Sequence, residues 1–309
     1  MRALIGGSGS PELVEVPVPQ AGPGQVRIKV AAAGVNPFDL AVAAGSLPQY
    51  GLARELPSYG LGFDAAGTVD QVGEGAPFTV GEAVIGLAAR LELPTKAQAE
   101  YVVLDAPAVA RAPRNVSAEA ASTLPLNSLT AWQALDATGL RPGQRLLVTG
   151  AAGAVGGFLV QLGVARGLRV VAVAGAADEE LVRGFGAEWF VPRDADLAPA
   201  VRALVAGGVD AVVDAALSPV AALDALADGG TFVALSVGVA PVALRGTVVR
   251  TVFFRAEPAQ LAEIVRLVEA GRVTARVAGT YPLAKAADAH ARLAAGGVRG
   301  RLVLIPGSA

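Results

Sequence analysis

The residues best suited to chemistry in this 309-residue chain form a glycine-rich loop, residues 150–156, which follows the apolar run at 146–148. The spacing predicts a strand, a tight turn and a helix, with Gly150, Gly153 and Gly156 allowing close approach of a pyrophosphate. The free N–H groups at the start of that helix would face the anion. Ala151 occupies the first glycine position of the strict fingerprint, so a ligand-free glycine turn is the competing interpretation.

Other side chains that commonly carry chemistry are scarce. The chain has no cysteine, which excludes thiolate metal sites, disulfides and cysteine nucleophiles. Its only histidine, His290, lies in an alanine-rich segment predicted to be helical, and we interpret it as a structural hydrogen-bonding residue. The net charge is −2 and basic residues do not cluster, so nucleic acid is not expected as a partner.

Two patterns of elements must position these residues. Short strands at 25–30, 65–72 and 100–103, separated by Gly and Pro, predict a β domain. From residue 117, helices alternate with apolar strands at 169–174, 211–214 and 231–235, which is typical of a parallel sheet. A helix at 261–269 and a last strand at 300–305 follow. We therefore predict an α/β fold with a domain at 1–116, completed by 277–309, and a second domain at 117–276.

The apolar content of 53% comes mainly from Ala and Val, and no apolar run approaches the ~20 residues of a membrane span. The start of the chain reaches Gly6-Gly7-Ser8-Gly9 after a very short apolar stretch, unlike a secretory signal. We expect a soluble, cytoplasmic protein without a membrane partner.

Five motifs together resemble one family. They are residues 33–39 (AGVNPFD), 62–69 (GFDAAGTV), 124–132 (LPLNSLTAW), the glycine loop, and Ala289-His290 followed by 300–304 (GRLVL). In this order, along the whole chain, they are similar to the zinc-independent quinone oxidoreductase branch of the medium-chain dehydrogenase/reductase superfamily. The resemblance implies a GroES-like β domain, a Rossmann doubly wound parallel-sheet domain, an active cleft between them, and a homodimer.

The same resemblance implies a reaction. Family members reduce quinones or α,β-unsaturated carbonyls with NADPH, so a small apolar quinone or enone is the expected substrate. Zinc-dependent relatives carry Cys at the position of Asn36 and His at the position of Phe63, and this chain lacks both ligands. Hydride addition to an enone leaves a delocalised enolate, which hydrogen-bond donors stabilise without a metal ion. We therefore expect no metal site.

Asn36 is the leading active-site candidate, since its amide would hold the nicotinamide ribose or the substrate carbonyl; a structural turn before Pro37 is the equal alternative. Asp39 is expected to cap a helix at 40–44 or to order the Asn-Pro turn. Asp64, where zinc relatives carry an acidic residue, is expected to have a structural hydrogen-bonding role.

Tyr50 and Tyr59 are candidates to donate to a substrate oxygen, with an aromatic rim as the alternative. The chain lacks the Tyr that relatives carry after the glycine at position 45, so solvent is another proton source. The entrance segment, residues 46–58, is mainly apolar and offers one cation, Arg54.

The resemblance also places several residues at the cofactor, each with a structural alternative. Thr130 matches a nicotinamide contact or caps a helix. Ser236, Phe253 and Phe254 match the nicotinamide end, or the two phenylalanines form an apolar dimer edge. The glycine loop contributes the remaining positions, namely Gly150, Ala151, Ala152, Gly153, Ala154, Val155 and Gly156.

The segment after the strand at 169–174 bears on cofactor choice. It contains Gly175 and Asp178 but no Lys or Arg; Asp178 suits a ribose hydroxyl and equally the N-cap of a helix at 179–185. Arg193 is placed to meet a 2′-phosphate. We expect NADPH, with NADH possible.

The sequence thus predicts an NAD(P)H-dependent quinone or enone oxidoreductase. Two alternatives fit the same residues: a dedicated biosynthetic tailoring reductase or cyclase, and a non-catalytic, crystallin-like nucleotide-binding protein. The physiological substrate is not encoded in any motif.

Overall fold

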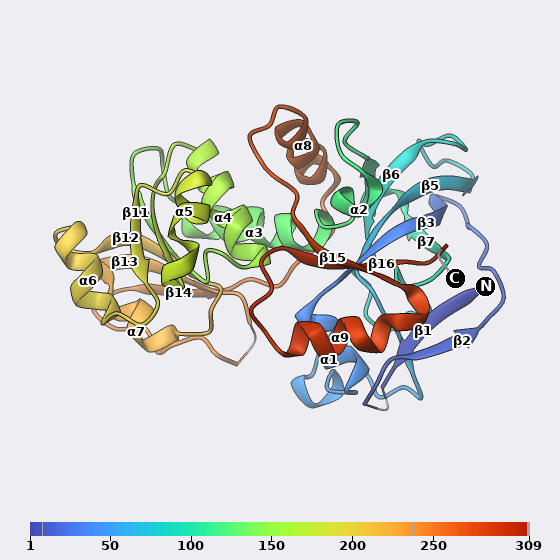
Figure 1. Ribbon diagram of the computed structural model, residues 1–309, viewed down its shortest axis with the longest axis horizontal. Helices are drawn as coiled ribbons and strands as arrows, with labels where there is room; N and C mark the ends of the chain where they lie inside the picture. The colour runs from blue at the N-terminus through green and yellow to red at the C-terminus, as the bar shows by residue number, and fades with distance from the viewer. Residues whose placement is uncertain (8, 237, 308–309) are drawn as a thin grey trace. The chain divides into compact units, whose positions relative to one another are not determined.

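The computed structural model describes residues 1–7, 9–236 and 238–307 (Figure 1). Ser8 and the last two residues of the predicted domain at 277–309 lie outside these ranges. The chain forms two compact units: unit 1 comprises residues 1–126, 255–271 and 275–309, and unit 2 comprises 127–254 and 272–274. Unit 1 thus includes residues 117–126, 255–271 and 275–276, which the sequence assigned to the second domain; the boundaries expected from the sequence remain predictions.

Unit 1 is built mainly from antiparallel strands. One sheet has the order β2-β1-β4, and the other has the order β15-β16-β3-β5-β6-β8, with β7 paired to β3. The strands are β1 (Arg2–Gly6), β2 (Glu12–Glu15), β3 (Gln25–Val35), β4 (Tyr59–Gly60), β5 (Asp64–Val72), β6 (Ala83–Leu87), β7 (Tyr101–Asp105), β8 (Val109–Arg111), β15 (Val277–Pro282) and β16 (Arg301–Ile305). The C-terminal strand β16 pairs with β3, as the predicted return of the chain requires.

The core of unit 1 lies against the long strand β3. Val26, Ile28 and Val30 alternate inward along it and pack with Val69 and Val102 of neighbouring strands. The helices are α1 (Pro37–Ala43), α2 (Ala118–Ala121), α8 (Pro258–Glu269) and α9 (Ala286–Ala294), with short 3₁₀ turns η1 (Pro48–Tyr50), η2 (Ala106–Ala108) and η4 (Leu283–Lys285). Helix α3 (Pro125–Thr138) begins in unit 1 and continues in unit 2.

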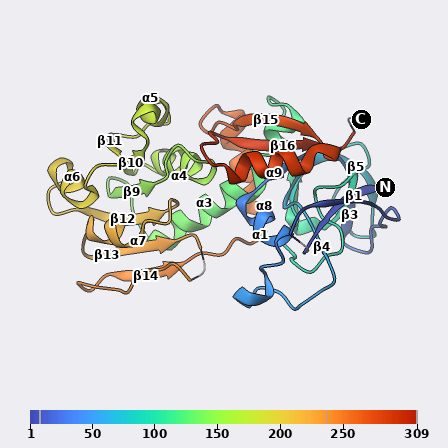
Figure 2. The ribbon, with the colours of Figure 1, turned by 60° about the horizontal axis from the view of Figure 1, so that its bottom comes forward.

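Unit 2 contains a parallel sheet of six strands in the order β11-β10-β9-β12-β13-β14, which Figure 2 shows in sequence with β14 at the edge. The strands are β9 (Arg145–Thr149), β10 (Arg169–Ala174), β11 (Trp189–Pro192), β12 (Val209–Asp214), β13 (Leu226–Ala234) and β14 (Val248–Thr251). The chain proceeds outward from β9 in one direction and then restarts beside β9 in the other. In open parallel sheets, ligands bind where the strand order reverses in this way.

Apolar strands and crossover helices form the core of unit 2. Leu147, Val171 and Val212 from three adjacent strands pack with Val201 and Phe232. The helices are α4 (Ala154–Ala165), α5 (Glu179–Gly184), α6 (Leu197–Leu204) and α7 (Pro219–Asp224), with the 3₁₀ turn η3 (Ala176–Asp178). Among the described residues, no helix has the length and apolar character that crossing a membrane requires.

Most predicted elements are present, with shifted ends. The strand predicted at 169–174 coincides with β10, and the strand predicted at 231–235 is the second half of β13, which begins at Leu226. The helix predicted at 40–44 begins earlier, at Pro37. Proline at the first helical position needs no N–H partner there, and Asn36 provides the N-cap, so the helix starts three residues sooner.

Candidate functional site

The glycine loop joins β9 to α4 at the point where the strand order of unit 2 reverses. Gly150 has a φ of 61°, in the left-handed region that glycine tolerates. A Cβ at Gly156 would lie 2.0 Å from the Gly150 carbonyl oxygen, so only glycine lets α4 pack this closely on the loop. Ala151 and Ala152 are buried, and Gly153 is the N-cap of α4. The first N–H groups of α4 lack partners within the helix, which leaves them available to an anion.

A side-chain pair that the sequence did not single out holds this loop. The Thr149 hydroxyl donates to the Asp214 carboxylate at 2.5 Å and accepts the N–H groups of Ala215 and Ala216 at 3.0 and 3.1 Å. Asp214 also accepts the Ser218 N–H at 2.9 Å. The pair thus connects the carboxyl ends of β9 and β12 and fixes the backbone next to Gly150. The sequence feature that could have revealed this pair is a polar residue at the end of each of two buried strands.

Asp178 and Arg193, which lie 15 positions apart, converge beside Gly175 at the end of β10. A Cβ at Gly175 would lie 3.1 Å from Asp178 Oδ2 and 3.2 Å from Arg193 Nη2. The Arg193 N–H donates to the Ala174 carbonyl, which fixes that residue beside β10. Asp178 occupies the N-cap position of α5, as the alternative required, but its side chain makes no capping hydrogen bond.

The remaining predicted cofactor residues of unit 2 lie on three different elements. Thr130 is inside α3, five residues after its start, so the alternative that it caps the helix is wrong. Ser236 follows β13 and is half-buried. Phe253 and Phe254 follow β14, with ring centroids 4.6 Å apart, and Phe253 is 43% exposed. Their contacts with a nicotinamide remain proposals.

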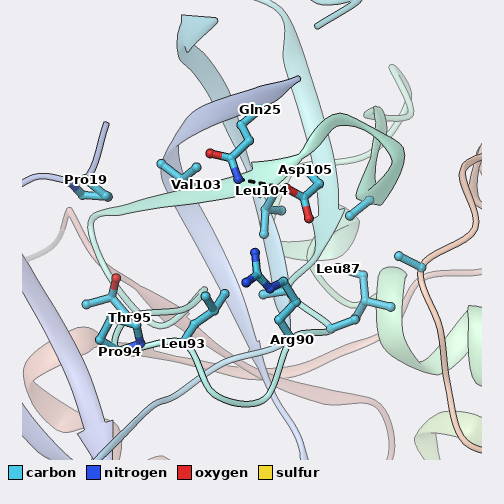
Figure 3. Close-up of a pocket in the computed structure, with 14 residues that line it drawn as sticks. Pro19, Gln25, Leu87, Arg90, Leu93, Pro94, Thr95, Val103, Leu104 and Asp105 are labelled. Atoms are coloured by element: carbon cyan, nitrogen blue, oxygen red, sulfur yellow. Dashed lines mark hydrogen bonds between the residues drawn. The ribbon is translucent and has the colours of Figure 1, made fainter. Parts of the chain in front are cut away.

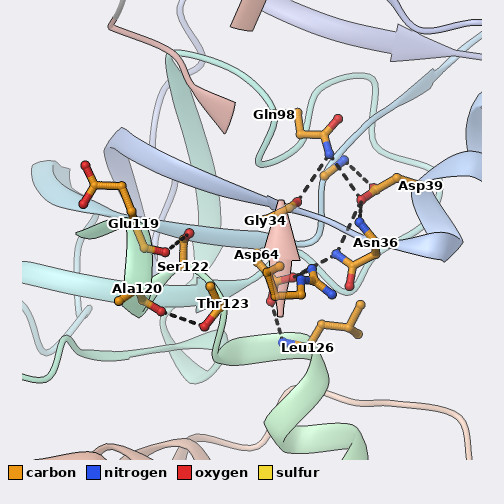
Figure 4. Close-up of polar contacts among 12 residues, drawn as sticks. Gly34, Asn36, Asp39, Asp64, Gln98, Glu119, Ala120, Ser122, Thr123 and Leu126 are labelled. Carbon is orange, nitrogen blue, oxygen red and sulfur yellow. Dashed lines mark hydrogen bonds and ion pairs between the residues drawn. The ribbon is translucent and has the colours of Figure 1, made fainter. Parts of the chain in front are cut away.

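In unit 1, Asn36, Asp39 and Asp64 meet in a buried hydrogen-bond network (Figure 4). The Asn36 side-chain amide donates to Asp64 Oδ2 at 2.9 Å, and its backbone N–H donates to Asp39 Oδ2 at 2.7 Å. Asp39 therefore orders the Asn-Pro turn, as predicted. Asp64 accepts the Leu126 N–H at 2.5 Å, so its predicted structural role is also confirmed.

Asn36 itself has a structural position: it is 1% exposed and is the N-cap residue of α1. Its Oδ1 makes no hydrogen bond with any described residue, because the Asp39 N–H donates to the main-chain carbonyl of Asn36 instead. A buried acceptor without a partner is costly. Oδ1 is therefore the Asn36 atom that a ligand's donor would meet. The backbone N–H and the side-chain amide of Asn36 have structural roles, because they donate to Asp39 and Asp64.

Three residues that sequence reasoning missed complete the network, which we call the polar cluster: Asn36, Asp39, Asp64, Lys96, Gln98 and Arg301. Arg301 donates to Asp64 Oδ2 at 2.9 Å, and the Gln98 amide donates to Asp39 Oδ2 at 3.2 Å. Lys96 is 1% exposed, with its ammonium 3.2 Å from the centroid of the Phe63 ring. Lys96 and Gln98 lie in no motif, and the 300–304 motif contains Arg301 but gives no sign of its partner Asp64, because these residues come from distant segments.

Burial shifts the ionisation of the polar cluster. Burial lowers the pKa of Lys96 to about 7, against the opposing attraction of Asp39 and Asp64. Burial raises the pKa of Asp39, opposed mainly by the hydrogen bond from the Asn36 N–H. Burial also raises the pKa of Asp64, opposed mainly by Arg301. The carboxylates and cations thus stabilise one another's charged forms in a site away from water.

The two candidate tyrosines have different surroundings. Tyr59 is buried, and its hydroxyl donates to the Arg54 carbonyl at 2.6 Å and accepts the Leu56 N–H at 3.2 Å. The buried ring of Tyr59 does not form the aromatic rim expected as the alternative, and its hydroxyl proton goes to the Arg54 carbonyl, so donation to a substrate oxygen stays a prediction. Tyr50 is 57% exposed and remains the better candidate donor. Arg54 pairs with Glu92 at 3.1 Å, so its charge is already offset.

His290 is buried in α9, yet neither ring nitrogen has a hydrogen-bond partner among the described residues. The hydrogen-bonding role expected of His290 is therefore wrong within the residues that the structure describes. Burial lowers the pKa of His290 to about 4, which keeps the imidazole neutral at neutral pH. The neutral form avoids the larger cost of burying a charge, while its donor and acceptor nitrogens are buried without partners among the described residues.

Unit 1 also contains a cavity of about 310 Å³, and Figure 3 shows the residues that line it. Leu93 and Leu104 are among its apolar residues, and Arg90, Gln25 and Asp105 provide polar groups. Gln25 donates to Asp105 at 2.9 Å. None of the predicted site residues lines this cavity.

Known families match both parts of the chain. The alcohol dehydrogenase GroES-like domain family matches residues 22–114, and the zinc-binding dehydrogenase family matches residues 185–304. The fold has the same two components: a largely antiparallel β unit and a parallel dinucleotide-binding sheet. Together they define a two-domain dehydrogenase.

Individual relatives agree with this class. The chain is 29% identical to an Arabidopsis thaliana chloroplast envelope quinone oxidoreductase homolog, over 97% of this chain and 95% of the relative. It is 29% identical to a 2-methylene-furan-3-one reductase from Solanum lycopersicum, over 94% and 74%. A solved structure titled NAD-dependent alcohol dehydrogenase is 32% identical, with a TM-score of 0.86 over 99% of this chain and 100% of the other.

The chain belongs to the medium-chain dehydrogenase/reductase superfamily, in its quinone oxidoreductase branch. The resemblance inferred from the five motifs is thereby confirmed, as is the fold of a GroES-like domain with a Rossmann domain. The chain is an oxidoreductase of a superfamily that uses a nicotinamide cofactor.

The donor set of this chain does not fit the zinc that one family's description implies. The sequence has no cysteine, and its one histidine is His290. Within residues 1–7, 9–236 and 238–307, no group of three or more His, Cys, Asp and Glu side chains is arranged to hold a metal ion. A catalytic zinc needs about three such protein ligands.

Proposed function

We propose that this protein is a zinc-independent, NAD(P)H-dependent reductase of quinones or of the C=C bond of α,β-unsaturated carbonyls. The observation that carries the proposal is the glycine loop at the strand-order reversal of unit 2, in a chain whose metal donors are insufficient for zinc. Relatives described as a quinone oxidoreductase homolog and as a furanone reductase support this substrate class.

The chain's own residues would divide the work as follows. A bound reduced nicotinamide supplies a hydride to the acceptor. The glycine loop would bind the pyrophosphate with backbone N–H groups, and Thr149 with Asp214 would hold the loop in place. Tyr50 or solvent would deliver the proton that the reduced acceptor needs.

The cofactor proposal is NADPH, with NADH as the alternative. Arg193 provides a cation beside Gly175 that suits a 2′-phosphate, whereas Asp178 on the same side suits ribose hydroxyls. The two side chains therefore favour different cofactors. We propose NADPH on the expectation that its 2′-phosphate contacts Arg193.

A homodimer is part of the proposal. Strand β14 has β13 as its only sheet neighbour among the described residues, so its outer edge is unpaired there. Val248 on this strand and Val242 before it are 44% and 80% exposed. Pairing of two such edges would cover both features. Light scattering on the purified protein measures its molar mass. We expect the mass of a dimer, and the mass of a monomer would contradict the proposal.

The function is tested by a turnover screen with NADPH and NADH against simple quinones and enones, with and without a metal chelator. We expect nucleotide oxidation that depends on the acceptor and is unaffected by the chelator. A chelator-induced loss that added zinc restores would contradict the metal-free proposal. Absence of turnover with every acceptor, despite tight nucleotide binding, would favour a non-catalytic protein.

A further inference from the structure

The cavity of unit 1 has no part in the proposed reductase. Its volume is about 310 Å³, and all of its lining residues belong to unit 1. Among the residues that the structure describes, none from the glycine loop or the polar cluster lines it. Ligand pockets of proteins have volumes of about 300–1,000 Å³. The cavity is therefore large enough for a small molecule.

Apolar side chains form most of the cavity wall. Leu87 at the end of β6 and Leu104 on β7 are both buried, and Leu93 is half-buried. Pro94 and Val103 add to the same wall. Walls of this kind favour a ligand with an apolar body, because the transfer of its CH₂ groups out of water is favourable. A purely polar ligand would gain little here.

Arg90 brings a positive charge to these apolar walls. Figure 3 shows its side chain between Leu87 and Leu93, with the guanidinium pointing toward Leu104. Within the described part of the chain, this guanidinium has neither a hydrogen bond nor an ion pair. It presents five N–H donors in a planar fork that matches a carboxylate. Because the side chain is exposed, a ligand from solvent can reach it.

Asp105 limits the charge that a ligand can carry. Its carboxylate lines the same cavity and accepts a hydrogen bond from the Gln25 amide at 2.9 Å. Asp105 and Arg90, both described by the structure, form no ion pair with each other, so the charge of Arg90 is not used by this carboxylate. A second negative charge on the ligand would meet Asp105 and be repelled. The lining therefore favours a ligand with a single negative charge.

We propose that this cavity binds a short-chain monocarboxylate. The carboxylate pairs with the Arg90 guanidinium, and the alkyl chain packs against Leu87, Leu93 and Leu104. A pair of this kind, with two parallel N–H···O bonds, combines charge with defined geometry. The site is additional to the proposed reductase activity, since it uses side chains of unit 1 and needs no nucleotide.

The test uses hexanoate as the probe and the full chain without nucleotide. Equilibrium dialysis with radiolabelled hexanoate at neutral pH measures binding, and unlabelled hexanol and adipate serve as competitors. Hexanol has the same chain without the charge, and adipate adds a second carboxylate. We expect saturable binding of hexanoate, with each competitor weaker than unlabelled hexanoate by about tenfold, as for loss of one hydrogen bond to a charged group. Absence of saturable binding, or equal competition by hexanol or adipate, would overturn the proposal.

Two variants locate the binding. Arg90→Met should weaken hexanoate binding by about tenfold, because the guanidinium is lost while an apolar stem remains. Arg141→Met removes an exposed arginine outside the cavity lining and changes the net charge equally, so it should bind hexanoate as the wild type does. Wild-type affinity in Arg90→Met, or an equal loss in both variants, would overturn the proposal. The wild-type competition series decides the question even if Arg90→Met does not fold.

Discussion

The glycine loop of unit 2 and the polar cluster of unit 1 are built in opposite ways. The loop comes from seven consecutive residues and offers backbone N–H groups without any charged side chain. The cluster joins residues as far apart as Asp64 and Arg301, 237 positions from one another, and contains four buried ionisable groups. A local backbone site suits binding of an anion that arrives with its own charge, whereas a non-local charged site must balance its charges before any ligand arrives.

The largest expected effect comes from breaking the charge balance in unit 1. Asp64→Ala leaves Arg301 buried without its carboxylate and removes the partner of the Leu126 N–H. We expect the free energy of unfolding to fall by about 3–5 kcal/mol, the usual cost of removing one partner of a buried ion pair. Urea unfolding measures it. Glu188→Gln, which breaks the exposed pair with Arg169, is the control and should cost at most about 1 kcal/mol. If both variants lost the same free energy of unfolding, the buried pair would contribute no more to stability than the exposed one.

Acid should weaken the protein through His290. Burial lowers its pKa to about 4 in the folded state, whereas the unfolded chain binds the proton below about 6.5. The stability associated with the neutral ring is therefore full above pH 6.5 and is lost as pH falls through 4, up to roughly 3 kcal/mol. His290→Leu should reduce this loss, as urea midpoints at pH 7 and pH 4.5 will show. An unchanged acid loss in the variant would contradict the account.

The glycine loop is tested by adding a single methyl group. Gly156→Ala would place Cβ 2.0 Å from the Gly150 carbonyl oxygen, so backbone must move, at about 1–3 kcal/mol for overpacking. NADPH binding should weaken at the same time. Gly184→Ala, at the end of α5, is the control, since a Cβ there would meet no atom within 4 Å. If thermal unfolding and NADPH titration showed the two variants to be alike, Gly156 would have no special role.

The smallest effect concerns cofactor choice. If Arg193 binds the 2′-phosphate, Arg193→Ala should weaken NADPH by about 1.5 kcal/mol, roughly tenfold, as expected for a hydrogen bond to a charged group. Affinity for NADH should stay the same, and fluorescence titration compares the two. A parallel loss for both nucleotides would indicate that Arg193 supports the fold beside Gly175 instead.

The same contrast explains what the sequence could predict. The glycine loop, its strand and its helix are local, so spacing revealed them. The pair of Thr149 and Asp214 was missed, although each residue lies at the end of a predicted strand. Asn36, Asp39 and Asp64 were found through motifs, whereas Lys96 and Gln98 lie in none, and the 300–304 motif gave no sign that Arg301 pairs with Asp64. Whether a lysine is buried against two carboxylates depends on tertiary packing, which periodicity does not encode. The predicted hydrogen-bonding role of His290 was wrong for the same reason, because its position in a helical segment does not show which side chains surround it.

The central claim is that unit 2 binds a reduced nicotinamide dinucleotide, and the most direct measurement is separate titration of the wild-type protein with NADPH and NADH. We expect saturable micromolar binding of at least one of them, tighter for NADPH, with the bound form oxidised when a quinone or enone is added. Failure of both nucleotides to bind would contradict the account and leave a dehydrogenase fold without its cofactor.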